Sequence, residues 1–207
     1  MNTNMQEKLA IKAVTDNRND RKPPLDYTFM CLTSVKECLD EDPRGLIQVQ
    51  KNDDKKASSE QVEKKKHDTT AIRLSNNLIT EWSDFSQCIS DIIIEPFKLE
   101  WIDLSFNDIY TIDKCILDYP NLKVLYLHGN AIDKISELDK LANLKYLKTL
   151  TLHGNPIEED VSGYRQYVLS KLPQLKTFDF SAVTKQDRAS AQTWNQMIKS
   201  KKGTKKK

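Results

Sequence analysis

The sequence predicts an α/β fold, a solenoid of stacked parallel strands capped at both ends, because one pattern recurs along the centre of the chain. Residues 99–109, 122–132 and 147–157 are three copies of this pattern. Each copy has apolar residues at its first, fourth, sixth and last positions and an asparagine at its ninth. A fourth copy over residues 69–79 is degenerate, with threonine in place of the leading leucine. Together with the segment after the last copy, about four to five repeats are expected.

The pattern L-x-x-L-x-L-x-x-N-x-L is that of leucine-rich repeats. Its two central apolar residues are separated by one position, so both side chains point to the same face of a short strand. One repeat cannot bury that face alone, whereas stacked neighbours bury it together. The asparagine turns the chain inward, and we expect its side-chain amide to hydrogen-bond backbone groups that the turn leaves unpaired. These structural asparagines are Asn77, Asn107, Asn130 and Asn155.

The spacing of the asparagines predicts what connects the strands. Successive asparagines are 30, 23 and 25 residues apart. The long first interval has room for a helix on the convex side, and its apolar residues follow helical spacing up to Pro96. The 23-residue interval has room only for a turn or a short 3₁₀ helix.

Composition changes divide the chain into six segments. The charged insert has almost no large apolar residues and cannot support a core. The segments are a flexible N-terminal arm (1–22), an N-terminal cap (23–49), a charged flexible insert (50–68), the leucine-rich repeat domain (69–183), a C-terminal capping helix (184–198) and a basic tail (199–207).

Both ends of the solenoid need covers, because a terminal repeat has no neighbour against its apolar face. In the N-terminal cap, Ser34 and Glu37 form a capping box for a short helix, which ends at Pro43 and Gly45. The apolar anchors of this cap are Leu25, Tyr27 and Phe29.

The chain after Asn155 departs from the repeat. Residues 164–172 follow helical spacing, and residues 175–180 predict one more strand without the asparagine. Thr184 and Asp187 then cap a last helix. This helix is expected to close the second open end of the solenoid. Its apolar face consists of Ala191, Trp194, Met197 and Ile198.

Composition limits the classes of function. The 207 residues are 38% apolar and 30% charged with a net charge of +2, so global charge implies no partner. No apolar run is long enough to span a bilayer, and the N-terminus lacks the apolar core of a signal peptide. We therefore expect a cytoplasmic protein without membrane contact. The four cysteines show no C-x-x-C spacing and are most simply free thiols.

The candidate binding surface is the concave side of the strands, since concave faces of solenoids are typically extended binding surfaces. The residues between the core positions point to that side. An exposed Trp101 beside Tyr126 and Arg73 resembles an interface hot spot, although Trp101 packed on the N-terminal cap is an open alternative. The candidate protein-binding residues are Arg73, Trp101, Asp103, Val124, Tyr126, His128, Thr151, His153 and Asp179.

The sequence offers no metal, cofactor or catalytic site. His128 and His153 occupy equivalent positions on strands about 4.8 Å apart, but a zinc ion would need further ligands and the rest of that column holds only serines. Phosphate-binding loops, dinucleotide fingerprints and nucleophile elbows are absent from the sequence. We predict a protein that is not an enzyme.

The repeats, with the ending Gly-Asn-Pro at 154–156 and Tyr-Arg-Gln-Tyr-Val-Leu at 164–169, resemble the short cytoplasmic leucine-rich repeat family. That family includes phosphatase-regulating proteins and the axonemal dynein light chain of the repeat class, which share a C-terminal cap. Two segments resemble one branch of the family: Trp-Ile-Asp-Leu-Ser-Phe-Asn-Asp at 101–108 and Pro-Pro-Leu-Asp-Tyr at 23–27. The first of them contains residues that the general repeat pattern does not require. The resemblance implies a cytoplasmic, non-enzymatic interaction protein with a place in cilia, and fixes no partner.

Two functional hypotheses follow. The first is a structural adaptor of the ciliary or flagellar axoneme that grips a protein on its concave face, with axonemal proteins or tubulin as partners. The lysine-rich stretches would add a salt-sensitive contact with acidic surfaces. The second is a regulatory subunit or adaptor of a cytosolic enzyme such as a protein phosphatase. Nucleic-acid binding is disfavoured because the net charge is near zero and no aromatic-basic platform is present.

Overall fold

The computed structural model of the chain describes residues 22–45 and 66–204. The predicted flexible arm, except Lys22, and the predicted charged insert, except residues 66–68, lie outside the described residues. The last helix ends at Thr204, so the start of the predicted basic tail is helical instead.

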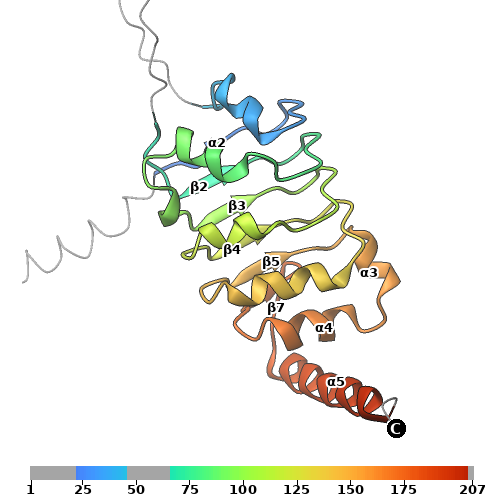
Figure 1. Cartoon of the computed structure of the whole chain (residues 1–207). Helices are drawn as coiled ribbons and strands as arrows, with labels where there is room; N and C mark the ends of the chain where they lie inside the picture. Colours follow the sequence, from blue (N-terminus) through green and yellow to red (C-terminus); the bar gives the residue numbers. More distant parts are fainter. Residues whose placement is uncertain (1–21, 46–65, 205–207) are drawn as a thin grey trace, which may run out of the picture.

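The described residues form one seven-stranded sheet in which the strands follow each other in chain order (Figure 1). The first six strands are parallel, and the last turns back antiparallel to its neighbour. The predicted solenoid of parallel strands is confirmed. The strands are β1 (Leu25–Asp26), β2 (Ala71–Arg73), β3 (Trp101–Asp103), β4 (Val124–Tyr126), β5 (Thr149–Thr151), β6 (Thr177–Phe178) and β7 (Ser181–Ala182).

The core follows from the register of the parallel pairs. The central residues of successive strands align with one another and are fully buried, because a period of two directs all of them to the same side. Such burial of aliphatic side chains stabilises the stack by about 1.5–3 kcal/mol per residue. The aligned residues are Ile72, Ile102, Leu125, Leu150 and Phe178.

The asparagines form a ladder along one edge of the core. Asn107 Nδ2 donates to the carbonyl of Leu74 in the preceding repeat at 3.0 Å and to that of Leu104 in its own repeat at 3.1 Å. Its Oδ1 accepts from the Ile79 amide at 3.0 Å. Each side chain therefore ties two repeats together through otherwise unpaired backbone groups. Asn77, Asn130 and Asn155 make equivalent contacts.

The connections on the convex side have the predicted lengths. The long first interval forms the α-helix α2 (Phe85–Ile92), and the 23-residue interval forms only the 3₁₀ segment η3 (Lys114–Asp118). The remaining helical segments are the 3₁₀ segments η1 (Val35–Leu39), η2 (Pro96–Lys98) and η4 (Ile135–Asn143), and the α-helices α3 (Pro156–Asp160), α4 (Tyr164–Lys171) and α5 (Lys185–Thr204). In Figure 1, α4 lies on the same side of the strands as α2, α3 lies at the edge of the stack, and α5 lies at its C-terminal end.

The N-terminal cap differs from prediction in three details. It contributes a strand of its own, because Leu25 pairs in register with Ile72. The predicted anchor Phe29 is 64% exposed, since its positive φ of 56° turns the ring away from the core. Ser34 is the N-cap residue as predicted and its hydroxyl lies 3.4 Å from Glu37 Oε1, but Glu37 also accepts from the amide and hydroxyl of Thr33, and the helix ends at Leu39.

The C-terminal cap is also modified. Thr184 and Asp187 make the predicted capping box, in which the Asp187 amide donates to Thr184 Oγ1 at 3.0 Å and the Thr184 amide donates to Asp187 Oδ2 at 2.8 Å. Phe180 lies in the turn between β6 and β7 and not on an inward-facing strand. On α5, Met197 is exposed, so the face that packs on α4 is narrower than predicted.

Candidate protein-binding surface

The predicted concave columns are present on β2 to β5. One column runs through Ala71, Trp101, Val124 and Thr149, and a second runs through Arg73, Asp103, Tyr126 and Thr151. His128 and His153 follow the second column by two residues, and the ring of His128 contacts those of Tyr126 and His153.

Six rings on this side form a continuous surface, which we call the aromatic face. Tyr126 is its centre, with the Trp101 ring at 6.1 Å, the His128 ring at 6.0 Å and the Phe180 ring at 5.7 Å between centroids. Edge-to-face arrangements of this kind are favourable for aromatic pairs. The aromatic face consists of Trp101, Phe106, Tyr126, His128, His153 and Phe180.

Two phenylalanines flank a stacked pair of histidines on the aromatic face. The rings of His128 and His153 are 4.7 Å apart and nearly parallel, with 11° between their planes. Phe106 lies 4.9 Å from His128, and Phe180 lies 5.5 Å from both histidines. Phe106 is 53% exposed and Phe180 is 61% exposed. Exposed rings around a half-covered floor are typical of an interaction site.

Both phenylalanines occupy unusual backbone conformations. Phe106 has a φ of 52° at the position where the next repeats have Gly129 and Gly154, with φ of 67° and 69°. Phe180 has a φ of 58° in the two-residue turn between β6 and β7, where glycine is the usual residue. A left-handed conformation costs an L-residue roughly 1–2 kcal/mol. Because strained residues cluster at functional sites, this observation supports a binding role for the two rings.

The ring of Phe106 also explains one glycine. A Cβ atom on Gly129 would lie 2.6 Å from Cδ1 of Phe106. The Phe106 ring therefore covers the backbone of the next repeat, and Gly129 is needed both for its positive φ and for this close approach.

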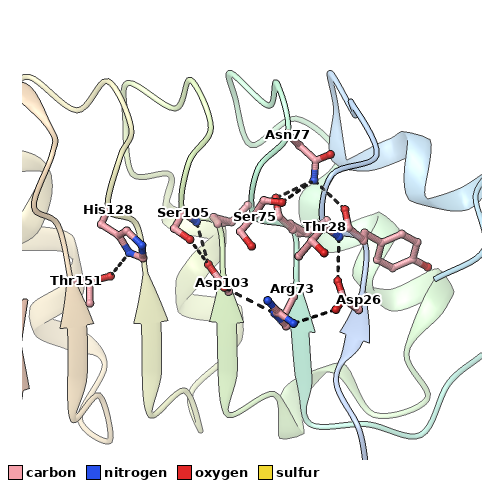
Figure 2. A network of polar contacts seen from close by, with 12 residues as sticks. Asp26, Thr28, Arg73, Ser75, Asn77, Asp103, Ser105, His128 and Thr151 are labelled. Carbon is pink, nitrogen blue, oxygen red and sulfur yellow. Dashed lines mark hydrogen bonds and ion pairs between the residues drawn. The ribbon is translucent and has the colours of Figure 1, made fainter. Parts of the chain in front are cut away.

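The charged residues of the second column are held by one another. Arg73 Nη1 lies 2.9 Å from Asp26 Oδ2, and Arg73 Nε lies 4.0 Å from Asp103 Oδ2 (Figure 2). Asp103 Oδ1 accepts from the amide of Ser105 at 3.0 Å and from its hydroxyl at 2.6 Å. Asp103 is only 6% exposed, so it orients Arg73 and offers no free carboxylate to a partner.

The polar residues next to the histidines are also engaged. The fully buried Thr151 contacts His128 Nδ1 through its hydroxyl at 2.8 Å (Figure 2). Burial, and then the neighbouring His153, lowers the pKa of His128 below its ordinary value. His128 therefore contributes a neutral ring to this floor at physiological pH.

Asp179 lies outside the concave column in which the sequence placed it. It follows the end of β6, and its Oδ1 accepts from the backbone amides of Leu152 at 2.6 Å and His153 at 3.1 Å. Its Oδ2 accepts from the hydroxyl of Tyr164 at 3.0 Å. This carboxylate therefore ties the last strand to the repeat before it, in the manner of the repeat asparagines.

Trp101 lies between the N-terminal cap and the concave surface, so it has features of both predictions, packing on the cap and a place in the binding surface. Its ring is half-buried and lines a groove of about 610 Å³ together with Pro23 and Pro24 of the N-terminal cap and with Val124 and Tyr126. Trp101 thus connects the cap to the aromatic face. Val124 is partly exposed in the same groove and remains a candidate contact residue.

Sequence reasoning missed Phe106 and Phe180. The repeat pattern assigns no role to the residue before each asparagine, although only glycine and asparagine fit its backbone easily. A phenylalanine at such a position, as in Phe106-Asn107, is the sequence signal that could have identified it. Phe180 was assigned to a strand because the hairpin after β6 has no repeat signature.

No group of three or more histidine, cysteine, aspartate or glutamate side chains in residues 22–45 and 66–204 is placed to hold a metal ion. Among the same residues, no helix is long and apolar enough to cross a membrane.

The fold and its asparagine ladder define a leucine-rich repeat protein with a concave aromatic face. Residues 66–207 match the family model described as a leucine-rich repeat. The leucine-rich repeat-containing protein 51 of Rattus norvegicus is 46% identical over 188 residues, covering 90% of this chain and 92% of that protein. The protein of the same name from Homo sapiens is 44% identical over the same shares. The chain therefore belongs to the leucine-rich repeat family and, within it, to the family of leucine-rich repeat-containing protein 51.

A solved structure shares the architecture. The crystal structure of the Drosophila melanogaster SNF/U2A′ complex contains a chain that superimposes with a TM-score of 0.53 and 26% sequence identity, covering 67% of this chain and 75% of that chain. The similarity confirms that the strand stack is that of a leucine-rich repeat domain. This fold is consistent with a protein-interaction adaptor.

Proposed function

We propose that the protein is a non-enzymatic adaptor that holds a segment of another protein on its aromatic face. The observation that carries this proposal is the pair Phe106 and Phe180, which are more than half exposed and have strained backbones. Neither ring is needed to fill the core, so a bound partner is the best reason for their exposure. The related repeat protein in the SNF/U2A′ complex also occurs in a complex, which supports a protein as the ligand.

We further propose that the partner belongs to the ciliary or flagellar axoneme, so that the protein is cytoplasmic and axonemal. The support is the resemblance of the repeats and of the C-terminal cap to a family that includes an axonemal light chain. A cytosolic enzyme such as a protein phosphatase is the alternative partner, because the same repeat type serves both.

Proximity labelling in ciliated cells tests both levels of the proposal. The chain would be compared with the double variant Phe106→Ser/Phe180→Ser and with Phe97→Ser as matched control. Phe97 is 53% exposed but belongs to η2, which precedes β3, and it makes no ring contact with the aromatic face. We expect the double variant to lose the specifically labelled neighbours and the control to keep them.

Fractionation of demembranated axonemes then separates the two kinds of partner. Retention on salt-washed axonemes with labelled axonemal neighbours would support the axonemal adaptor. A soluble chain that labels a phosphatase or another cytosolic enzyme would support the alternative. Identical labelling by the double variant and the chain itself would exclude the aromatic face as the binding site.

A further inference from the structure

Three lysines lie in register beside the aromatic face, and we call them the lysine row: Lys123, Lys148 and Lys176. Each precedes the first residue of its strand, in β4, β5 and β6. The backbone amide of Lys148 donates to the Lys123 carbonyl at 2.8 Å, and that of Lys176 donates to the Lys148 carbonyl at 2.7 Å. Because neighbouring strands are about 4.8 Å apart, three like charges start from adjacent positions.

The structure neutralises only one end of the lysine row. Lys123 Nζ lies 2.5 Å from Glu100, which occupies the same register position just before β3. Among the described residues, no carboxylate pairs with Lys148 or Lys176. Arg188 adds a further positive charge at that end, where its guanidinium donates to the carbonyl of Leu175. Repulsion along the row is therefore uncompensated at its C-terminal end.

The lysine row borders the apolar groove of the aromatic face. Lys123 lines this groove together with Trp101, Val124 and Tyr126. Lys148 and Lys176 continue the same edge on the next two strands, because the backbone amide of each donates to the carbonyl of the lysine before it. The binding surface thus has an aromatic floor and a basic edge along the beginning of the strands.

We propose that the segment bound here is acidic: its carboxylates lie over Lys148 and Lys176, and a large apolar side chain enters the groove beside Trp101. This inference rests on the proposed function and gives the chemistry of its ligand. Charge complementarity supports it, because carboxylates would relieve the repulsion within the row. A nucleic acid fits less well, since Glu100 neutralises Lys123 at one end of the row and would repel a phosphate backbone that continued past that end.

Selection from a random peptide library displayed on phage tests this assignment with the full-length chain as bait. We expect peptides in which aspartate or glutamate flanks tryptophan, phenylalanine or leucine. The variant Lys148→Glu/Lys176→Glu should bind the best such peptide at least about tenfold more weakly and should select lysine-containing peptides instead. Lys148→Gln/Lys176→Gln removes the charge without reversing it and should weaken binding less.

The matched control is Lys114→Glu/Lys134→Glu. These exposed lysines lie on η3 and just before η4, on the convex side, and the double substitution changes net charge by the same amount. Circular dichroism verifies that every variant is folded. The control should bind the selected acidic peptide as the unmodified chain does, and added salt should weaken binding to both.

The outcomes separate this inference from the proposed function. Peptides that bind through Phe106 and Phe180 but show no acidic bias would overturn the inference and leave the adaptor function standing. Acidic peptides whose affinity is unchanged by Lys148→Glu/Lys176→Glu would also overturn the inference. Failure of the folded chain to select any peptide would count against both, and tight binding of single-stranded RNA through the lysine row would replace the peptide assignment.

Discussion

At the scale of single residues, Phe106 has two opposing effects on stability. Its left-handed backbone costs roughly 1–2 kcal/mol, while the half-buried ring that packs over Gly129 and against His128 contributes about 1 kcal/mol. Asparagine adopts this conformation more easily, and Asn76 has it at the equivalent position of the first repeat. We therefore expect Phe106→Asn to change the free energy of unfolding in urea by no more than about 1 kcal/mol.

The same variant should lose binding of the partner or of a selected peptide. Phe97→Asn, a substitution of an equally exposed ring outside the aromatic face, should preserve binding. A loss of about 3 kcal/mol of stability in Phe106→Asn would instead assign the ring to the core, because losses of that size follow from truncating buried aromatic residues.

The lowered pKa of His128 gives stability a dependence on pH. Burial and His153 lower the pKa of folded His128 below the ordinary value of 6.5, so the unfolded chain binds more protons between these two pKa values. Stability is then fully present above about pH 6.5 and falls as the pH drops below it. Urea denaturation between about pH 7.5 and about pH 5.5 measures this loss.

His128→Gln is the variant that isolates this effect. It removes the titrating group while an amide can still contact the hydroxyl of Thr151. We expect a smaller decrease in stability across the same pH range than in the unmodified chain. An unchanged decrease would assign the pH dependence to other groups.

At the scale of elements, the carboxylate of Asp187 is one of the contacts that attach α5 to the repeat domain. Asp187 accepts from Arg165 of α4 at 2.9 and 3.0 Å and from the Thr184 amide. The Arg165 hydrogen bonds, followed by those from Thr184, hold the pKa of Asp187 well below its usual range. Its contribution is therefore present at neutral pH and is lost only as the pH falls through the lowered folded pKa.

Asp187→Ala should accordingly lower the free energy of unfolding at neutral pH by about 1–2 kcal/mol, the usual cost of losing a capping side chain with a charged partner. Chemical denaturation followed by circular dichroism measures both the stability and the helix content. Glu159→Ala, which removes an exposed carboxylate on α3, is the control and should change neither. Equal effects of the two variants would contradict a specific role for the Asp187 contacts.

The elements differ in how far sequence could predict them. Strands β2 to β5 and the asparagine turns were predictable, because a buried alternation and an amide with fixed partners recur in each copy. Strands β1 and β7 have two residues each and leave no periodic signal, so only pairing with neighbouring strands reveals them. Pairing at the ends of a sheet depends on contacts distant in sequence.

The sequence could predict which residues of the candidate surface face the concave side, but not which of those side chains are exposed to solvent. Register placed Trp101 and Tyr126 on the concave side, where they contact each other. It could not show that Asp103 and Thr151 are covered, because their hydrogen bonds to neighbouring side chains depend on rotamers. The contribution of Phe180 depends on a turn conformation for which the repeat pattern has no position.

At the scale of the whole molecule, each repeat contacts mainly its neighbours, so stability is transmitted along the solenoid from one repeat to the next. The cap strand β1 covers the first repeat through the fully paired and buried Leu25. The amide of Leu74 in the first repeat donates to the carbonyl of Asp103, whereas the amide of Leu127 in the middle of the stack donates to that of Thr151.

Leu25→Asp would place a charge at a site that is 3% exposed and should detach the cap. Hydrogen exchange should then become much faster at the Leu74 amide and change little at the Leu127 amide, since the middle repeats keep both neighbours. Phe29→Asp, in the same segment but at a residue that is 64% exposed, should change neither amide. Equal loss of protection at both amides would show that the solenoid unfolds as one unit. If only the Leu74 amide loses protection, Leu25→Asp disrupts the end of the solenoid alone. The variant would then disrupt the groove beside Trp101, which the cap helps to line, and leave the ring cluster around Phe180 folded.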